Sequence, residues 1–241
     1  VYDGTNAVLA AELTTHAGLI GSETVTLSGS TTTTGSGGAN KNVANDVGIT
    51  SNATGITVAN GSNGGLATNY TLTGGTHETD ITKKDFSIAL ARQYDATNQA
   101  KPNSVDSATT ETFSGLVSVS GTAETLTLGG TNGTVSNANA TGSAQAVTIG
   151  GLNVGNGSGA SASSGGLIAN YNLTGVTLTI SPRVLTSSGS RVYDGTTTAG
   201  NSDITLGNLA NSQTLVLSGA GTTSSKDAGS YSLSNLSGAS I

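Results

Sequence analysis

All six tyrosines of this chain fall within two short motifs that recur along the sequence. The first motif reads VYDGT at residues 1–5, QYDAT at 93–97 and VYDGT at 192–196. The second reads LATNYTLTG at 66–74, LIANYNLTG at 167–175 and DAGSYSLSN at 227–235. This self-similarity constrains the fold, because each repeat must either bury a core of its own or stack on its neighbours. A period of roughly 60 to 100 residues is too long for one solenoid coil and favours small self-contained domains.

Two further markers divide the chain into units. An alternating apolar stretch predicts a strand with one buried face at residues 23–29, 124–130 and 213–219. The joint at residues 81–97 aligns without gaps with residues 180–196. We therefore predict three units, at residues 1–82, 83–181 and 182–241. The first lacks the strand expected before its VYDGT, and the third is shorter.

The composition predicts an all-β fold. Strong helix formers are sparse, Thr and Val are abundant, the 36 glycines punctuate the chain, and no window shows sustained apolar spacing at 3.6 residues. We expect tandem small antiparallel β-sandwiches, Ig-like or related, arranged as beads on a string. The alternative is a β-helix, although regular coils of about twenty residues are not visible. Gly-, Ser- and Asn-rich stretches at residues 35–46 and 154–166 predict long loops or small hairpins.

Charge and residue content argue against several functions. The net charge is -6 and the eight Lys and Arg residues are scattered, so nucleic acid is not an expected partner. There are no cysteines, and no apolar stretch is long enough to insert into a membrane. The two histidines, His16 and His77, have no repeat equivalents, and no nucleophile-elbow motif is present. We expect no enzymatic activity.

The ordered motifs resemble the YDG and MBG-type repeats of very large bacterial surface proteins, including two-partner-secreted and filamentous-haemagglutinin-like adhesins. The resemblance rests on VYDGT, on KNV at 41–43 and KDAG at 226–229, on NYTLT at 69–73 and on ITKKDF at 81–86. It covers nearly the whole chain. It implies a secreted segment of a stalk or fibre at the bacterial cell surface, without a catalytic role.

The scarce residues of the two tyrosine motifs are the candidate site residues. We interpret them as a structural signature in which Tyr packs and Asp-Gly forms a turn; the alternative is sugar recognition by Tyr and Asp. The signature comprises Tyr2, Asp3, Gly4, Tyr94, Asp95, Tyr193, Asp194, Gly195, Tyr70, Tyr171 and Tyr231. Because Ala96 replaces the glycine in one copy, we expect that position not to need a positive φ. Arg92 and Arg191 precede the motif, where an Arg stacked on Tyr or paired with the nearby Asp would stiffen the joint.

Other chemistry has weaker support in the sequence. No cofactor is expected, although calcium could bridge a joint through Asp80 and Asp85. Five lysines could form Lys-Asn or Lys-Asp crosslinks, but none recurs in all three units; they are Lys41, Lys83, Lys84, Lys101 and Lys226.

The sequence thus favours a structural role in cell-surface or biofilm adhesion. The expected partners are other repeats of the same polypeptide or neighbouring fibre subunits, including partners joined by strand addition. The alternative is a carbohydrate-binding adhesive module that recognises surface glycans through the long loops of the first two units. Exposed aromatic residues would favour that alternative, yet only Phe113 lies outside the repeat markers.

Overall fold

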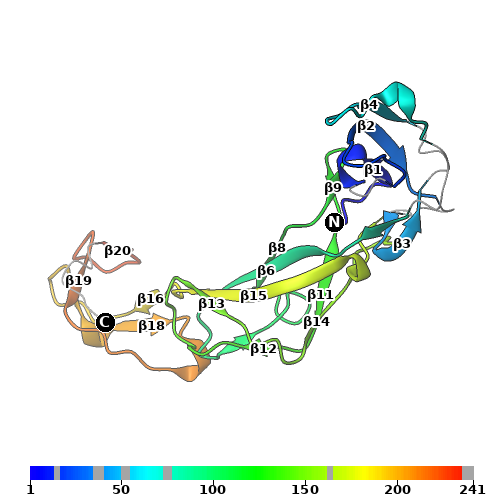
Figure 1. Cartoon of the computed structure of the whole chain (residues 1–241). Coiled ribbons are helices and arrows are strands. Elements are labelled where there is room, and N and C mark those ends of the chain that lie inside the picture. Colours follow the sequence, from blue (N-terminus) through cyan, green and yellow to red (C-terminus); the bar gives the residue numbers. More distant parts are fainter. Residues whose placement is uncertain (14–16, 35–40, 50–54, 73–77, 162–164, 235–241) are drawn as a thin grey trace.

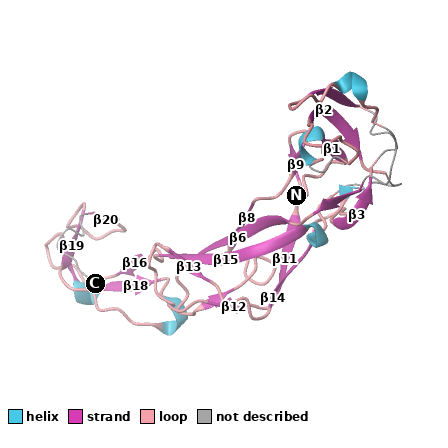
Figure 2. Cartoon of the chain, viewed as in Figure 1, coloured by secondary structure: helices cyan, strands magenta, loops and turns pink. Residues whose placement is uncertain are grey.

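The chain is all-β and elongated. The computed structural model describes residues 1–13, 17–34, 41–49, 55–72, 78–161 and 165–234. These residues form β-strands and short 3-10 helices, without an α-helix among them (Figures 1 and 2). Over the described ranges, no helix has the length and hydropathy needed to cross a membrane. We keep the names unit 1, unit 2 and unit 3 for the predicted ranges.

Unit 1 contains two small antiparallel sheets. One has the strand order β1-β2-β4 and the other pairs β3 with β5. The elements are β1 (Ala7–Leu9), η1 (Ala10–Glu12), β2 (Val25–Thr32), β3 (Ala44–Gly48), β4 (Ile56–Asn60), η4 (Ala67–Asn69) and β5 (Glu78–Ile81).

Unit 2 holds the largest sheet, which has the order β13-β15-β6-β8. Smaller pairs are β11 with β14, β7 with β12, and β9 with β10. The elements are β6 (Lys84–Gln93), β7 (Gln99–Ala100), β8 (Thr110–Ser114), β9 (Ser118–Val119), β10 (Thr122–Ala123), β11 (Leu126–Gly130), β12 (Gly133–Thr134), β13 (Ala144–Ala146), β14 (Leu152–Asn156), η5 (Ile168–Asn170) and β15 (Tyr171–Ser181).

Unit 3 pairs β16 with β18 and has a second sheet of order β17-β19-β20. Its elements are β16 (Thr186–Gly189), β17 (Thr198–Gly200), η6 (Asn201–Asp203), β18 (Ile204–Gly207), η7 (Ala210–Ser212), β19 (Ala220–Thr223) and β20 (Leu233–Ser234).

The main hydrophobic core lies in unit 2. Every second residue is a large apolar one along residues 86–90 of β6 and 176–180 of β15, and these side chains share one face of the sheet and are at most 4% exposed: Phe86, Ile88, Leu90, Val176, Leu178 and Ile180. The joint alignment places Leu185, Ser187 and Gly189 of unit 3 at the positions of Phe86, Ile88 and Leu90. Unit 3 therefore contributes much less apolar surface from this strand.

The longest pairing departs from the antiparallel prediction. Strands β6 and β15 run parallel, with register pairs from Tyr171 with Lys84 to Ser181 with Gln93. The reason lies in the joints, because β6 brings the chain into unit 2 and β15 carries it out toward unit 3 in the same direction (Figure 1). The remaining strand pairs among the described residues are antiparallel.

The prediction of a strand at residues 213–219 is wrong. Its counterparts begin β2 and form β11, which pair with β4 and β14. Residues 213–217 of unit 3 have no regular strand structure, and Leu215 and Val216 are 46% and 82% exposed. The physical reason is that β4 and β14 come from the longer segments of units 1 and 2, and the short unit 3 has no equivalent segment to pair with this stretch.

Candidate functional site

The Tyr-Asp-Gly motif forms the same turn in all three units. The Asp Oδ1 atom accepts a hydrogen bond from the backbone N–H of the Thr two residues later, at 2.8 Å for Asp3, 2.8 Å for Asp95 and 2.9 Å for Asp194. The Thr hydroxyl donates to the same carboxylate. The motif is therefore a turn closed by its own Asp side chain.

The expectation about Ala96 is wrong. The φ angle is 78° at Gly4, 67° at Ala96 and 78° at Gly195, so all three residues lie in the left-handed region. The surrounding hydrogen bonds impose the same backbone on Ala96, which carries the strain of a Cβ atom at positive φ.

An Arg–Asp ion pair supports two of the turns, which is one of the two arrangements expected from the sequence. Arg92 Nη1 lies 2.6 Å from Asp95 Oδ1, and its guanidinium also donates to the carbonyls of Gln93, Gln99 and Thr97. The Arg92 side chain is only 2% exposed. Arg191 makes the equivalent 2.6 Å contact with Asp194, where both side chains are more exposed. The pKa of Asp194 is lowered, first by hydrogen bonds from Thr196 and then by Arg191.

The first tyrosine of the chain packs against unit 2 rather than within unit 1. Tyr2 is 1% exposed, and its hydroxyl donates to Glu124 Oε1 at 2.6 Å. Tyr171 is 2% exposed and donates to Glu124 Oε2, also at 2.6 Å. One carboxylate thus joins the tyrosine of the first motif in unit 1 to the tyrosine of the second motif in unit 2. We call Tyr2, Glu124 and Tyr171 the Tyr–Glu–Tyr contact.

The three rings around this contact form an aromatic cluster. The Tyr2 and Tyr171 ring centroids are 5.6 Å apart, and those of Phe86 and Tyr171 are 5.7 Å apart, both with edge-to-face geometry. Burial, followed by the hydrogen bond to Glu124, raises the pKa of both tyrosines above the usual 10.0. The phenols therefore stay protonated and serve as donors to the carboxylate.

Contacts on both sides of the joint hold the first turn and its receiving residues in place. Tyr2 N–H donates to the Thr82 carbonyl at 2.8 Å, at the end of unit 1, and within unit 2 Val117 N–H donates to the Tyr171 hydroxyl at 3.0 Å. A Cβ atom on Gly4 would lie 2.8 Å from Val117 Cγ1 and 2.7 Å from Val119 Cγ2. Glycine is therefore required at this position by the close approach as well as by its φ angle.

A second polar contact crosses the same joint. The side chain of Asn170 is buried, donating from Nδ2 to Asn42 Oδ1 at 2.9 Å and accepting at Oδ1 from Val43 N–H at 3.0 Å. The KNV motif of unit 1 thus contacts the residue that precedes Tyr171 in unit 2.

The joint between units 2 and 3 uses related residues. Within unit 2, Tyr94 N–H donates to the Ser181 carbonyl at 2.9 Å, and across the joint Gln213 Nε2 donates to the Tyr94 hydroxyl at 2.8 Å. Gln213 occupies the position of Glu124 in the third marker. The packing is looser here, because a hollow of about 260 Å³ lies between Tyr94, Pro182, Leu185, Leu209 and Leu215.

The remaining signature tyrosines differ in their surroundings. Tyr70 donates to Glu23 Oε2 within unit 1, and its hydroxyl accepts from Ile20 N–H at 3.2 Å. Tyr193 and Tyr231 are 61% and 38% exposed. The structure therefore brings together Tyr2 and Tyr171, and leaves Tyr193 and Tyr231 at the surface of unit 3.

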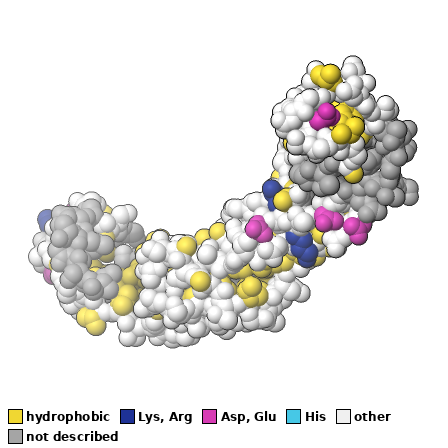
Figure 3. All heavy atoms as spheres, viewed as in Figure 1, with side chains coloured by type: hydrophobic (Ala, Val, Ile, Leu, Met, Phe, Trp, Pro, Cys, Tyr) yellow, Lys and Arg dark blue, Asp and Glu magenta, His cyan; other side chains and the backbone are white. Residues whose placement is uncertain are grey.

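The two carboxylates considered for calcium have other partners. Asp80 Oδ1 accepts from Asp46 N–H at 3.0 Å, and Asp85 Oδ1 accepts from Asn172 Nδ2 at 2.8 Å. Among the residues the structure describes, no group of three or more metal-ligating side chains comes together. Figure 3 shows isolated charges rather than a continuous basic patch on the face in view.

The carboxylate and amide at the joints are not among the residues singled out from sequence. Glu23, Glu124 and Gln213 occupy one aligned position, immediately before the apolar alternation of the third marker. The recurrence of a side chain with an acceptor oxygen at this position in all three copies is the sequence signal that could have identified these residues. Comparison of this chain with protein-family models, curated proteins and solved structures found no match.

Proposed function

We propose that this chain is a structural segment of an extracellular bacterial adhesin or matrix fibre, built of tandem β-sandwich units. Its role is to hold repeated units in a fixed end-to-end arrangement, in support of surface or biofilm adhesion. The observation that carries the proposal is the buried Tyr–Glu–Tyr contact, which joins two consecutive units through side chains that recur with the repeat.

The physical argument concerns rigidity. A joint held only by exposed polar side chains would bend freely, since such pairs contribute about 0–1 kcal/mol. Here two buried phenols share one carboxylate and pack edge to face, so separating the units would break the Tyr2–Glu124 hydrogen bond and expose the buried Tyr2 ring to water. The resemblance of the ordered motifs to surface-adhesin repeats agrees with such a role.

Solution scattering of the whole chain tests this mechanical role. We expect an extended particle, and we expect Glu124→Leu to broaden its distribution of distances because both phenols lose their acceptor, at a cost of about 1–3 kcal/mol each. Glu124→Gln is the matched control and should keep the extended shape, since Gln213 already bonds a tyrosine at the equivalent position. A flexible wild-type chain would contradict the proposal.

Two further measurements address location and the competing function. Antibodies raised against the chain should label the surface of intact cells of the source organism. A glycan array should show no saturable binding, whereas the carbohydrate-binding alternative requires it. The buried positions of Tyr2 and Tyr171 remove two of the six tyrosines from any sugar-binding surface.

A further inference from the structure

Unit 1 has a surface with the same hydrogen bonds as the surface of unit 2 on which Tyr2 docks. In unit 2, Tyr171 donates to Glu124 and accepts from Val117 N–H, while Glu124 N–H donates to the Val117 carbonyl. In unit 1, Tyr70 donates to Glu23 and accepts from Ile20 N–H, while Glu23 N–H donates to the Ile20 carbonyl. The same three hydrogen bonds are therefore made in both units. We call Ile20, Glu23, Asn69 and Tyr70 the receiving surface.

The receiving surface differs from its counterpart by what covers it. Val117 is 5% exposed beneath the first turn, whereas Ile20 is 74% exposed. Asn170 is 1% exposed, whereas Asn69 is classed as exposed. Within the described part of the chain, Tyr70 is the one tyrosine whose hydroxyl bonds to Glu23, while Glu124 receives two.

Unit 3 carries the matching turn in an undocked state. Residues 192–196 have the same sequence as residues 1–5, and Gly195 has the same φ of 78° as Gly4. The Asp194 carboxylate closes this turn just as Asp3 closes the first. Yet Tyr193 is 61% exposed where Tyr2 is 1% exposed, and Val192 is 89% exposed. The turn is preformed, and the Tyr193 side chain is mostly exposed.

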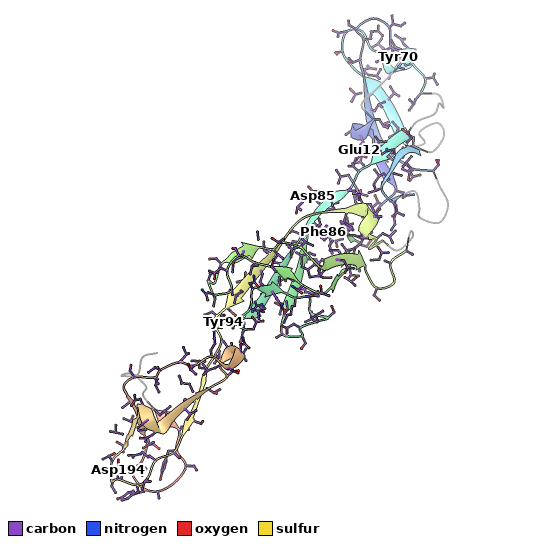
Figure 4. The ribbon with its side chains drawn as sticks, turned by 90° about the horizontal axis from the view of Figure 1, so that it is seen from below. Glu12, Tyr70, Asp85, Phe86, Tyr94 and Asp194 are labelled. Carbon is purple, nitrogen blue, oxygen red and sulfur yellow. The ribbon has the colours of Figure 1, made fainter. Side chains whose placement is uncertain are left out.

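These two surfaces lie at opposite ends of the molecule. Figure 4 places Tyr70 at one end and Asp194 at the other, with Phe86 and Tyr94 between them. We propose that the turn at residues 192–196 docks on the receiving surface of a second copy of this chain, with the Tyr193 hydroxyl donating to Glu23. The internal contact between Tyr2 and Glu124 is the template for this docking.

The template also suggests a second contact. Asn42 of unit 1 accepts from Asn170 of unit 2, and the aligned KDAG motif places Asp227 at the position of Asn42 in unit 3. Asp227 is exposed and carries acceptor oxygens. In the proposed contact, Asn69 Nδ2 of the second copy donates to Asp227.

This contact joins two different surfaces, so it is head-to-tail and adds copies in one direction; the rotation between copies decides between a ring and an open filament. The inference shares with the proposed function the premise of end-to-end units, but it concerns association between chains. Failure of association would leave the scattering result for a single chain unaffected.

Disulfide trapping tests the contact, because the chain has no natural cysteine. On the template, a Cβ atom at Gly4 lies 2.8 Å from Val117 Cγ1, which brings the two Cβ atoms to roughly the 3.5–4.5 Å of a disulfide. Gly195→Cys and Ile20→Cys are the equivalent positions on two separate chains. Gly4→Cys with Val117→Cys in one chain is the positive control.

We expect the Gly195→Cys and Ile20→Cys chains to form a mixed disulfide on the order of ten-fold faster than Ile20→Cys with Ser104→Cys, which is an exposed turn position. Adding Tyr193→Phe or Glu23→Leu should remove the advantage, while Glu23→Gln should keep it, as Gln213 does for Tyr94. A rate equal to that of the Ser104 pair, or no effect of Glu23→Leu, would overturn the proposal.

A measurement on the unaltered chain guards against misfolding of the cysteine variants. Hydrogen exchange at the Ile20 amide should slow as the protein concentration rises, and Tyr193→Phe should abolish this dependence. Exchange that is independent of concentration in the wild-type chain at the highest soluble concentration would contradict the contact.

Discussion

At the scale of single residues, one carboxylate determines how two units meet. Glu124 is only partly buried, yet it accepts from two phenols that are almost fully buried. Replacement by Gln at the next joint reverses the roles, because Gln213 donates to Tyr94 instead of accepting. The position therefore tolerates an amide, since a tyrosine hydroxyl can both donate and accept.

Gly4 and Gly195 have the same backbone conformation, but only Gly4 is packed against another unit. Substituting each by Ala therefore separates the steric effect of docking from backbone strain. Both have a φ of 78°, but a Cβ atom would contact Val117 and Val119 only at Gly4. We expect Gly195→Ala to destabilise unit 3 by about 1 kcal/mol from backbone strain, and Gly4→Ala to destabilise the first joint by about 1–3 kcal/mol more from overpacking. Thermal unfolding of both variants measures the difference, and equal effects would refute the steric argument.

The tyrosines make the first joint sensitive to alkaline pH. Their pKa values lie above the usual 10.0 because burial and Glu124 disfavour the phenolate. The unfolded chain consequently loses these protons first, so their contribution to stability is complete below about pH 10 and is lost as the pH rises beyond it. Unfolding followed against pH should show this loss in the wild type, with a smaller loss in Tyr2→Phe. Identical pH profiles would exclude the mechanism.

At the scale of elements, similar sequence motifs form a strand only where a neighbouring strand is present to pair with them. The third marker forms strands in units 1 and 2, where β4 and β14 supply the hydrogen bonds. In unit 3 no described strand takes that place, so the same alternation of residues remains without a ladder. Strand propensity depends on pairing as well as on the local sequence.

Hydrogen exchange measures this difference directly. The alternate amides of Leu126–Gly130 that bond to β14 should be protected, while amides of residues 214–217 should exchange on the order of ten-fold faster or more. The comparison is internal to one sample and needs no variant. Equal protection of the two stretches would show that residues 214–217 are paired after all.

The sequence predicts some of these features and misses others for identifiable reasons. The all-β class follows from composition, and the Arg92–Asp95 and Arg191–Asp194 pairs follow from spacing, because both are local. The Tyr2–Glu124 contact spans 122 residues, and spacing alone does not show which face of which unit receives a tyrosine. The left-handed backbone at Ala96 was missed because the closed turn overrides the preference of the residue.

At the scale of the whole molecule, the repeats are joined by docked turns as well as by covalent links. Each of the first two motifs bonds to the unit that follows, across 122 residues at Tyr2 and 119 residues at Tyr94. The contacts all point in one direction along the chain. The molecule therefore has a direction: its two ends, marked by Tyr70 and Asp194 in Figure 4, carry different contact surfaces.

The parallel pairing of β6 and β15 determines how unit 2 responds to tension. The chain enters at Lys84 and leaves at Ser181, which lie at opposite ends of the paired strands. A pull on the two termini therefore loads all the hydrogen bonds of this ladder in shear, whereas a hairpin would unzip bond by bond. We expect force spectroscopy to show unit 2 as the last and strongest unfolding event, weakened by Leu178→Ala beneath the ladder. If unit 2 gave way at the lowest force, the ladder would not be the element that resists stretching.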